Sequence, residues 1–157
     1  MKRIFLVYAL LIVAILAFAA MRGGSFLPTS LFKTTPTATI NGKIFNLSVA
    51  RSDKDRIKGL SGKDSLEQNT GMLFVFNKKD YYSFWMKDMK FPIDIIFIDD
   101  STVVDLFENT LPPQNINSEL SVYKPKSPGN YVLEVNGGTA SKNNLKIGDK
   151  IELKGIK

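Results

Sequence analysis

The sequence predicts a mainly β domain, folded as a compact antiparallel sandwich or a partly open barrel with one or two short helices. Two observations lead to this fold class. Short β-prone runs recur at spacings of about ten residues, with turn residues between them. One of these runs, Gly71–Phe76, has no polar face, as expected for a strand that is covered on both sides. An apolar N-terminal helix, transmembrane or signal, is predicted to precede this domain.

The N-terminal segment begins with Lys2 and Arg3, which are followed by residues 4–21, all uncharged. These eighteen residues are enough to cross a bilayer as a helix, and a signal sequence has the same layout. Residues 1–22 are therefore interpreted as a signal anchor or a signal peptide, with the membrane contacted through residues 4–21. Positive charge before the apolar run holds the N-terminus in the cytoplasm, so we expect the domain outside the cytoplasmic membrane. Cleavage of the signal would make the protein secreted or periplasmic.

A change in composition marks the start of the domain. Residues 23–36 are dominated by Gly, Ser, Thr and Pro and are predicted to form a flexible tether. Residues 37–157 are predicted to form a single β-rich domain. Its first element is a hairpin over residues 37–50, because Asn41-Gly42 is a dipeptide that favours a two-residue turn.

A helix of two turns is predicted after the hairpin. Ser52 is followed three residues later by Asp55, which is nearly a capping box, and Gly59 is expected to end the helix. Ile57 and Leu60 are expected to face inward.

The rest of the domain is predicted to be strands and loops. Four runs are interpreted as an antiparallel meander: Gly71–Phe76, Tyr81–Met86, Ile93–Asp99 and Thr102–Glu108. Residues 109–130 lose this periodicity and contain four prolines, which predicts a long surface loop. Two further strands complete the sheet, Tyr131–Asn136 and Asp149–Lys154.

The composition excludes several kinds of chemistry. The chain has no histidine and no cysteine, so histidine-based triads, cysteine nucleophiles and imidazole or thiolate metal sites are excluded. We predict no cofactor and no metal site. Without Lys2, Arg3 and Arg22, the chain keeps 18 basic and 15 acidic residues, a net charge of +3. This charge is too small to indicate nucleic acid as a partner.

Two acids stand in apolar strands. Alternation places Ile93, Ile95 and Phe97 on one face of their strand, and Asp94 on the other face with two further isoleucines. Glu134 lies in the apolar run YVLEVN. A buried ion is costly unless it is paired, so the leading interpretation is that Arg56 forms an ion pair with one of these carboxylates and fixes the helix on the sheet. The alternatives are a pocket acid with a perturbed pKa, and solvation at a strand end.

Trp85 also allows two interpretations. A single tryptophan between Phe84 and Met86 in a strand is typical of a core position. The alternative is an aromatic platform for a sugar or peptide ligand, with Tyr81, Tyr82 and Phe91 as neighbours.

Four motifs in combination resemble the domain of unknown function 192 family, with similarity from about Ile44 to Leu153. They are R-x-x-G-L (Arg56–Leu60), G-M-L-F-x-F (Gly71–Phe76), F-W-M-K followed by P-x-D-I-I-F-I-D (Phe84–Asp99), and V-L-E-x-x-x-G (Val132–Gly138). The resemblance implies a compact, mainly antiparallel β domain, often exported, and no established activity. It marks five family-type positions that are candidates for a structural or ligand-contacting constellation: Arg56, Trp85, Lys87, Asp94 and Glu134. The chain departs from the family pattern at Asp88-Met89, where the family usually has Asn-Thr, and at Ser61, often methionine.

Three functions follow from these observations. The leading hypothesis is a membrane-tethered, extracytoplasmic β domain that serves as a non-catalytic binding or accessory module of the cell envelope, with a glycan or peptide as ligand. The first alternative is a glycan hydrolase in which Asp94 and Glu134 divide the roles of acid and base. The second alternative is a protein–protein interaction domain that uses the loop 109–130. The oligomeric state is not predicted.

Overall fold

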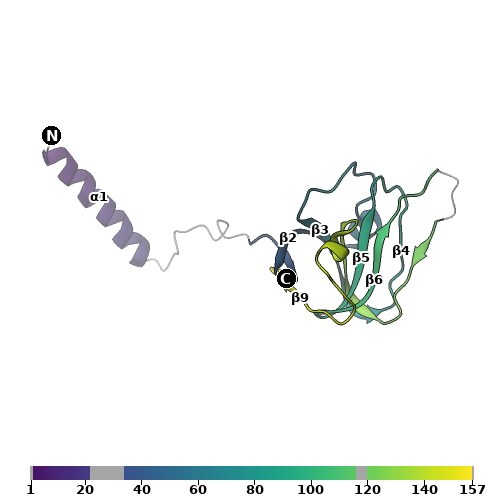
Figure 1. Cartoon of the computed structure of the whole chain (residues 1–157). Coiled ribbons are helices and arrows are strands. Elements are labelled where there is room, and N and C mark those ends of the chain that lie inside the picture. Colours follow the sequence, from purple (N-terminus) through teal and green to yellow (C-terminus); the bar gives the residue numbers. More distant parts are fainter. Residues whose placement is uncertain (1, 22–33, 116–119, 157) are drawn as a thin grey trace. The chain divides into compact units, whose positions relative to one another are not determined.

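The computed structural model describes residues 2–21, 34–115 and 120–156 (Figure 1). The chain divides into two compact units, Met1–Thr34 and Thr35–Lys157, and each is described by itself. Most of the predicted tether lies outside the described residues, as do residues 116–119 of the predicted loop 109–130.

The first unit contains one helix, α1 (Lys2–Met21). A search of the described residues finds no helix that is both long and apolar enough to span a membrane. The predicted helix over this segment is confirmed. The transmembrane or signal role predicted for it stays a prediction.

The second unit is built on one seven-stranded sheet that curls into a half-barrel (Figure 1). The strand order is β6-β5-β8-β3-β2-β1-β9. The bounds of these strands, in chain order, are β1 Thr37–Ile40, β2 Lys43–Ala50, β3 Thr70–Asp80, β5 Ile93–Asp99, β6 Thr102–Thr110, β8 Gly129–Asn136 and β9 Ile151–Lys154. Two very short strands, β4 (Phe84–Trp85) and β7 (Val122–Tyr123), form a separate antiparallel pair. Two short helices complete the unit, α2 (Asp53–Lys58) and α3 (Thr139–Lys142).

The two outer strands of the curled sheet meet at one end. The N–H of Val103 in β6 donates to the carbonyl of Asp149 at 2.9 Å, and the N–H of Ile151 in β9 donates to the carbonyl of Ser101 at 2.8 Å. These bonds close the sheet locally, because they join its first and last strands. Of the two predicted architectures, the partly open barrel is therefore the one that the chain adopts.

The predicted antiparallel order needs two corrections. The strands β2 and β3 pair in parallel, because α2 and the loop that follows return the chain to the same end of the sheet before β3 begins. The predicted meander is also wrong except for the pair β5–β6, since β8 lies between β3 and β5 and β4 is not in the main sheet. The predicted hairpin at Asn41-Gly42 is present as the antiparallel pair β1–β2.

Helix α2 begins and ends where the sequence predicts. The side chain of Ser52 caps it by accepting the N–H of Asp55 at 3.1 Å, and Gly59 follows its last residue with a positive φ of 48°. Of the two side chains expected to face inward, Leu60 is buried, but Ile57 is 73% exposed.

The sheet carries a hydrophobic cluster on each face. The inner face, as we name it, gathers apolar residues from all seven strands: Ala38, Ile40, Phe45, Leu47, Leu73, Ile96, Ile98, Val103, Leu133, Val135 and Ile151, with Ala140 and Leu145. The outer face carries Ala50, Phe74, Ile93, Ile95, Phe97 and Val132, and is covered by Leu60, Met86 and Met89. The alternation predicted for β5 is confirmed, since Ile93, Ile95 and Phe97 lie on the outer face and Ile96 and Ile98 on the inner face.

Candidate functional site

Asp94 lies on the inner face of β5 and is fully buried. Its carboxylate accepts three backbone N–H groups: Oδ1 accepts from Asn109 at 2.7 Å and Gly138 at 2.9 Å, and Oδ2 accepts from Ala140 at 2.7 Å. These donors come from the end of β6 and from the start of α3. Asp94 therefore satisfies buried backbone donors that would otherwise be unpaired, and it fixes both segments to β5.

Arg56 has other partners than those predicted. Its guanidinium bonds Asp53 on the same helix at 2.5 Å, donates to the carbonyls of Arg51 and Val75, and lies 5.1 Å from the centre of the Phe76 ring. The predicted ion pair between Arg56 and Asp94 or Glu134 is therefore wrong. Arg56 does not pair with Asp94 because the two lie on opposite sides of the sheet. Asp94 is on the inner face, whereas Leu60, just beyond α2, packs on the outer face.

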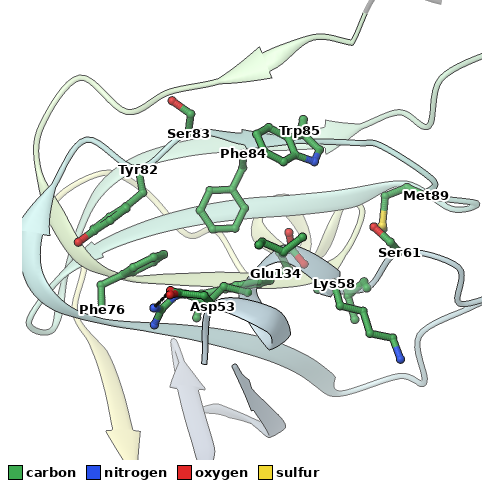
Figure 2. Close-up of a pocket in the computed structure, with 15 residues that line it drawn as sticks. Asp53, Lys58, Ser61, Phe76, Tyr82, Ser83, Phe84, Trp85, Met89 and Glu134 are labelled. Carbon is green, nitrogen blue, oxygen red and sulfur yellow. Dashed lines mark hydrogen bonds and ion pairs between the residues drawn. The ribbon is translucent and has the colours of Figure 1, made fainter. Parts of the chain in front are cut away.

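A cavity of about 260 Å³ opens on the outer face, between α2, β3 and the segment around β4 (Figure 2). In Figure 2, Phe84 and Glu134 lie near the middle of the residues drawn, with Phe76 and Tyr82 on the left and Met89 and Ser61 on the right. We call this cavity the Glu134 cavity. Its lining residues are Asp53, Arg56, Ile57, Lys58, Gly59, Leu60, Ser61, Phe74, Phe76, Tyr82, Ser83, Phe84, Trp85, Met89 and Glu134.

Packed rings form much of its wall. Phe76 and Tyr82 are stacked with ring centres 3.5 Å apart, and Phe84 meets Phe74 edge to face at 4.9 Å. Phe84 also meets Phe97 of the outer-face core at 5.8 Å. Because these rings hold one another in place, the wall is preformed rather than assembled by a ligand.

Glu134 is the buried acid of this cavity. Its residue is 5% exposed, and its Oε2 atom is buried without a hydrogen-bond partner in the described part of the chain. Burial raises the pKa of the Glu134 carboxyl from 4.5 to about 8. At neutral pH the group is therefore mostly a neutral acid that has one O–H to donate.

Two of the three other hydroxyl groups that line the cavity are already hydrogen-bonded, and the third belongs to Ser83, which is exposed. The Tyr82 hydroxyl donates to the carbonyl of Lys78 at 2.9 Å, and the Ser61 hydroxyl donates to the carbonyl of Lys87 at 2.9 Å. Burial and the nearby Asp80 carboxylate raise the pKa of Tyr82 above its ordinary value, so this phenol stays neutral near pH 7. Glu134 is thus the buried group that is left to bind a ligand.

Trp85 is not a core residue. It is 49% exposed and lines the Glu134 cavity, so the core interpretation is wrong and the alternative, an aromatic surface for a ligand, fits its position. Of the neighbours expected to join it, Tyr82 lines the cavity, whereas Tyr81 and Phe91 are not among the lining residues.

The structure divides the five candidate residues. Arg56, Trp85 and Glu134 line one cavity. Asp94 lies on the opposite face of the sheet, and Lys87 is exposed and contributes its backbone carbonyl to the bond with Ser61. The lining residues that the sequence did not mark as site candidates are Asp53, Ile57, Lys58, Gly59, Leu60, Ser61, Phe74, Phe76, Ser83, Phe84 and Met89. Phe74 and Phe76 could have been found, because they alternate along β3 on the face of Glu134 in the neighbouring strand.

The acid pair of the hydrolase hypothesis is not formed. Asp94 stands opposite Val135, and Glu134 stands opposite Ile95, so the two carboxyl groups project from opposite faces of the sheet. They cannot flank one glycosidic bond. No cluster of three or more acidic residues that could hold a metal ion occurs within residues 2–21, 34–115 and 120–156.

Comparison with known proteins places the domain in a family. The model of the domain of unknown function 192 family, described as "Uncharacterized ACR", matches residues 36–153. The crystal structure of a protein of unknown function from Novosphingobium aromaticivorans is 33% identical, with a TM-score of 0.67 over 76% of this chain and 84% of that one. The crystal structure of a putative transcription regulator from Sinorhizobium meliloti is 29% identical, with a TM-score of 0.67 over 77% of this chain and 95% of that one. A search of curated proteins gave no match. The family match covers the β domain almost from end to end, and the chain belongs to the domain of unknown function 192 family.

Proposed function

We propose that this domain is a non-catalytic module that binds a small, largely apolar ligand in the Glu134 cavity. The observation that carries the proposal is the Glu134 carboxyl, which lines the cavity, is buried, and has no hydrogen-bond partner for its Oε2 atom within the described residues. Leaving such a group unpaired costs about 1–3 kcal/mol. An apolar residue of similar size would avoid this cost, so the acid is best explained by a ligand that binds it.

The cavity limits the size of the ligand. Its volume of about 260 Å³ lies just below the range of roughly 300–1,000 Å³ that is usual for sites of drug-sized molecules. Leu60, Phe74, Phe84 and Met89 offer apolar contact on several sides. A ligand of about one ring with a single polar group therefore fits this cavity better than an oligosaccharide does.

A binding role is favoured over catalysis by the groups around the cavity. Glu134 is the buried acid of the lining, whereas Asp53 is exposed and paired with Arg56. The chain has no histidine or cysteine to act as a base or nucleophile beside Glu134. The hydroxyls of Ser61 and Tyr82 donate to backbone carbonyls, so neither is held by a base that would activate it.

The proposal includes a place in the cell. Lys2 and Arg3 before the uncharged residues 4–21, which form most of α1, support a tether that presents the domain outside the cytoplasmic membrane. In this setting the domain would act as an accessory module of the cell envelope.

The test uses the only tryptophan of the chain as a reporter. Trp85 lines the cavity, so its indole N–H resonance should shift when one-ring compounds bind to the full chain. Ser61 also lines the cavity, and Ser61→Phe should fill part of it and weaken binding by about tenfold or more, as expected for a loss of at least ~1.4 kcal/mol. Thermal unfolding checks that the variant is folded.

The matched control is Ser65→Phe, which adds the same ring to an exposed position of the same loop, outside the cavity lining. Its binding should equal that of the wild type. Equal binding by both variants would show that the ligand lies elsewhere and would overturn the proposal.

A further inference from the structure

We infer that the ligand of the Glu134 cavity presents an uncharged hydrogen-bond acceptor, such as a carbonyl oxygen, to the Glu134 carboxyl, which donates its proton in the hydrogen bond as a neutral acid. The inference rests on the proposed function and specifies its ligand class. It is drawn from the geometry of the cavity, which Glu134 lines with a carboxyl whose Oε2 atom has no hydrogen-bond partner within the described residues.

The surroundings of Glu134 are apolar along the sheet. Met72 of β3 and Ile95 of β5 are its neighbours in the adjacent strands, and neither offers a polar side chain. Across the cavity, Phe84 and Met89 are also apolar. An ionised carboxylate at this position would lack the donors that stabilise Asp94 on the other face.

The charged and titratable groups that line the cavity come from two segments. Asp53, Arg56 and Lys58 belong to α2, and Tyr82 follows β3. Arg56 is engaged by Asp53, while Lys58 and Asp53 are exposed. Burial is the cause of the raised pKa of Glu134, at about 8, so the carboxyl remains mostly protonated at neutral pH.

A cationic ligand fits this arrangement less well. It would need an ionised Glu134 in a site without supporting donors, and it would approach past Arg56 and Lys58, which carry the same sign of charge. An anionic ligand would place its charge against a neutral acid, while Arg56 is already engaged by Asp53 and Lys58 is exposed. A neutral acceptor needs neither ionisation nor a counter-charge, and it satisfies the Glu134 O–H directly.

The test compares four one-ring probes of similar shape on the full chain: benzamide, benzamidine as its cation, benzoate and toluene. Binding is followed by the Trp85 indole resonance at pH 6.5. Benzamide should bind about tenfold more tightly than toluene, the effect of one buried hydrogen bond. Benzamidine and benzoate should bind more weakly than benzamide.

The pH dependence of binding separates the ligand classes. Above pH 8 the affinity for benzamide should fall toward that for toluene, by up to about tenfold, because the fraction of protein with a protonated Glu134 falls. The affinity for toluene should stay nearly constant. Glu134→Gln should remove the fall with pH, since its amide does not ionise, and Glu134→Leu should remove the preference for benzamide over toluene.

The contrary outcomes are distinct. Tightest binding of benzamidine, with an affinity that rises with pH, would overturn the inference and leave the proposed function intact. Equal binding of toluene and benzamide at both pH values would also overturn the inference alone. The absence of any Trp85 shift with all four probes at millimolar concentration would overturn the proposed function together with the inference.

Discussion

Asp94 and Glu134 are buried acids in neighbouring strands, but their hydrogen-bonding surroundings are opposite. Asp94 faces the inner core and accepts three backbone N–H groups. Glu134 faces the outer side, where its Oε2 atom meets no donor. The Asp94 carboxylate is thus fully used in hydrogen bonds to the backbone, whereas the Glu134 carboxyl keeps an oxygen atom without a partner. Burial alone therefore does not distinguish a candidate ligand-binding acid from a structural one, and the lack of a hydrogen-bond partner beside a cavity is what makes Glu134 the candidate.

The largest effect on stability is expected from a substitution of Asp94, the acid whose carboxylate accepts three N–H groups. Asp94→Asn keeps one oxygen for two N–H groups but turns an amide N–H₂ toward the N–H of Ala140, so two donors face each other. We expect the free energy of unfolding to fall by about 3–5 kcal/mol, as when one partner of a buried charged network is removed. The melting temperature should fall by about 10–20 °C, measured by circular dichroism.

Asp64→Asn is the control for this substitution, because Asp64 is an exposed acid whose partner is Lys90. Its melting temperature should match that of the wild type. An Asp94→Asn variant as stable as the Asp64→Asn control would show that the three N–H groups do not depend on the carboxylate.

The sequence predicted the position of both acids but not their partners. Alternation in β5 and β8 correctly indicated acids inside apolar strands, because side-chain direction depends only on strand period. The donors to Asp94 are backbone N–H groups of Asn109, Gly138 and Ala140, which have no residue-type signature. The sequence therefore suggested the Arg56 guanidinium as the partner. This prediction is wrong because Arg56 bonds Asp53 of its own helix and the carbonyls of Arg51 and Val75.

The arrangement of strands was predictable only in part. The hairpin β1–β2 and the helix α2 follow from local signals at Asn41-Gly42 and Ser52. The parallel pair β2–β3 and the insertion of β8 between β3 and β5 depend on contacts between distant segments, which turn residues do not encode. The cavity depends on the same contacts, since its lining combines Glu134 of β8 with residues of β3 and of the segment around Trp85, which are distant in the sequence.

A second prediction concerns the dependence of stability on pH that Glu134 causes. The pKa of Glu134 is about 8 in the folded protein and 4.5 without burial, so between these values the folded state binds more protons than the unfolded state. The contribution of Glu134 to stability is complete below pH 4.5, is lost as pH rises toward 8, and stays constant above it. Between pH 5 and pH 7.5 this group should lower the free energy of unfolding by roughly 3 kcal/mol.

Chemical denaturation across this pH range, with Glu134→Gln beside the wild type, isolates the effect. The variant should lack this part of the pH dependence, and its stability relative to the wild type should therefore improve as pH rises. Glu108→Gln, an exposed acid on β6, should follow the wild-type curve. Parallel curves for the wild type and Glu134→Gln would mean that the Glu134 carboxyl is solvated or paired.

The smallest effect is expected from Arg56, which lines the cavity with Glu134 but does not bond it. Arg56→Met removes the bonds to Asp53 and to the carbonyls of Arg51 and Val75, and should cost about 1–2 kcal/mol of stability. The pKa of Glu134 should stay at about 8, because burial rather than a neighbouring charge raises it. Carboxyl NMR titration of both proteins measures this directly. A clear further rise in the pKa of Glu134 in the variant would mean that Arg56 stabilises the ionised carboxyl across the cavity, and the contrast between a paired Asp94 and an unpartnered Glu134 would then fail. An unchanged pKa of Glu134 would mean that burial alone raises it, as the contrast with Asp94 requires.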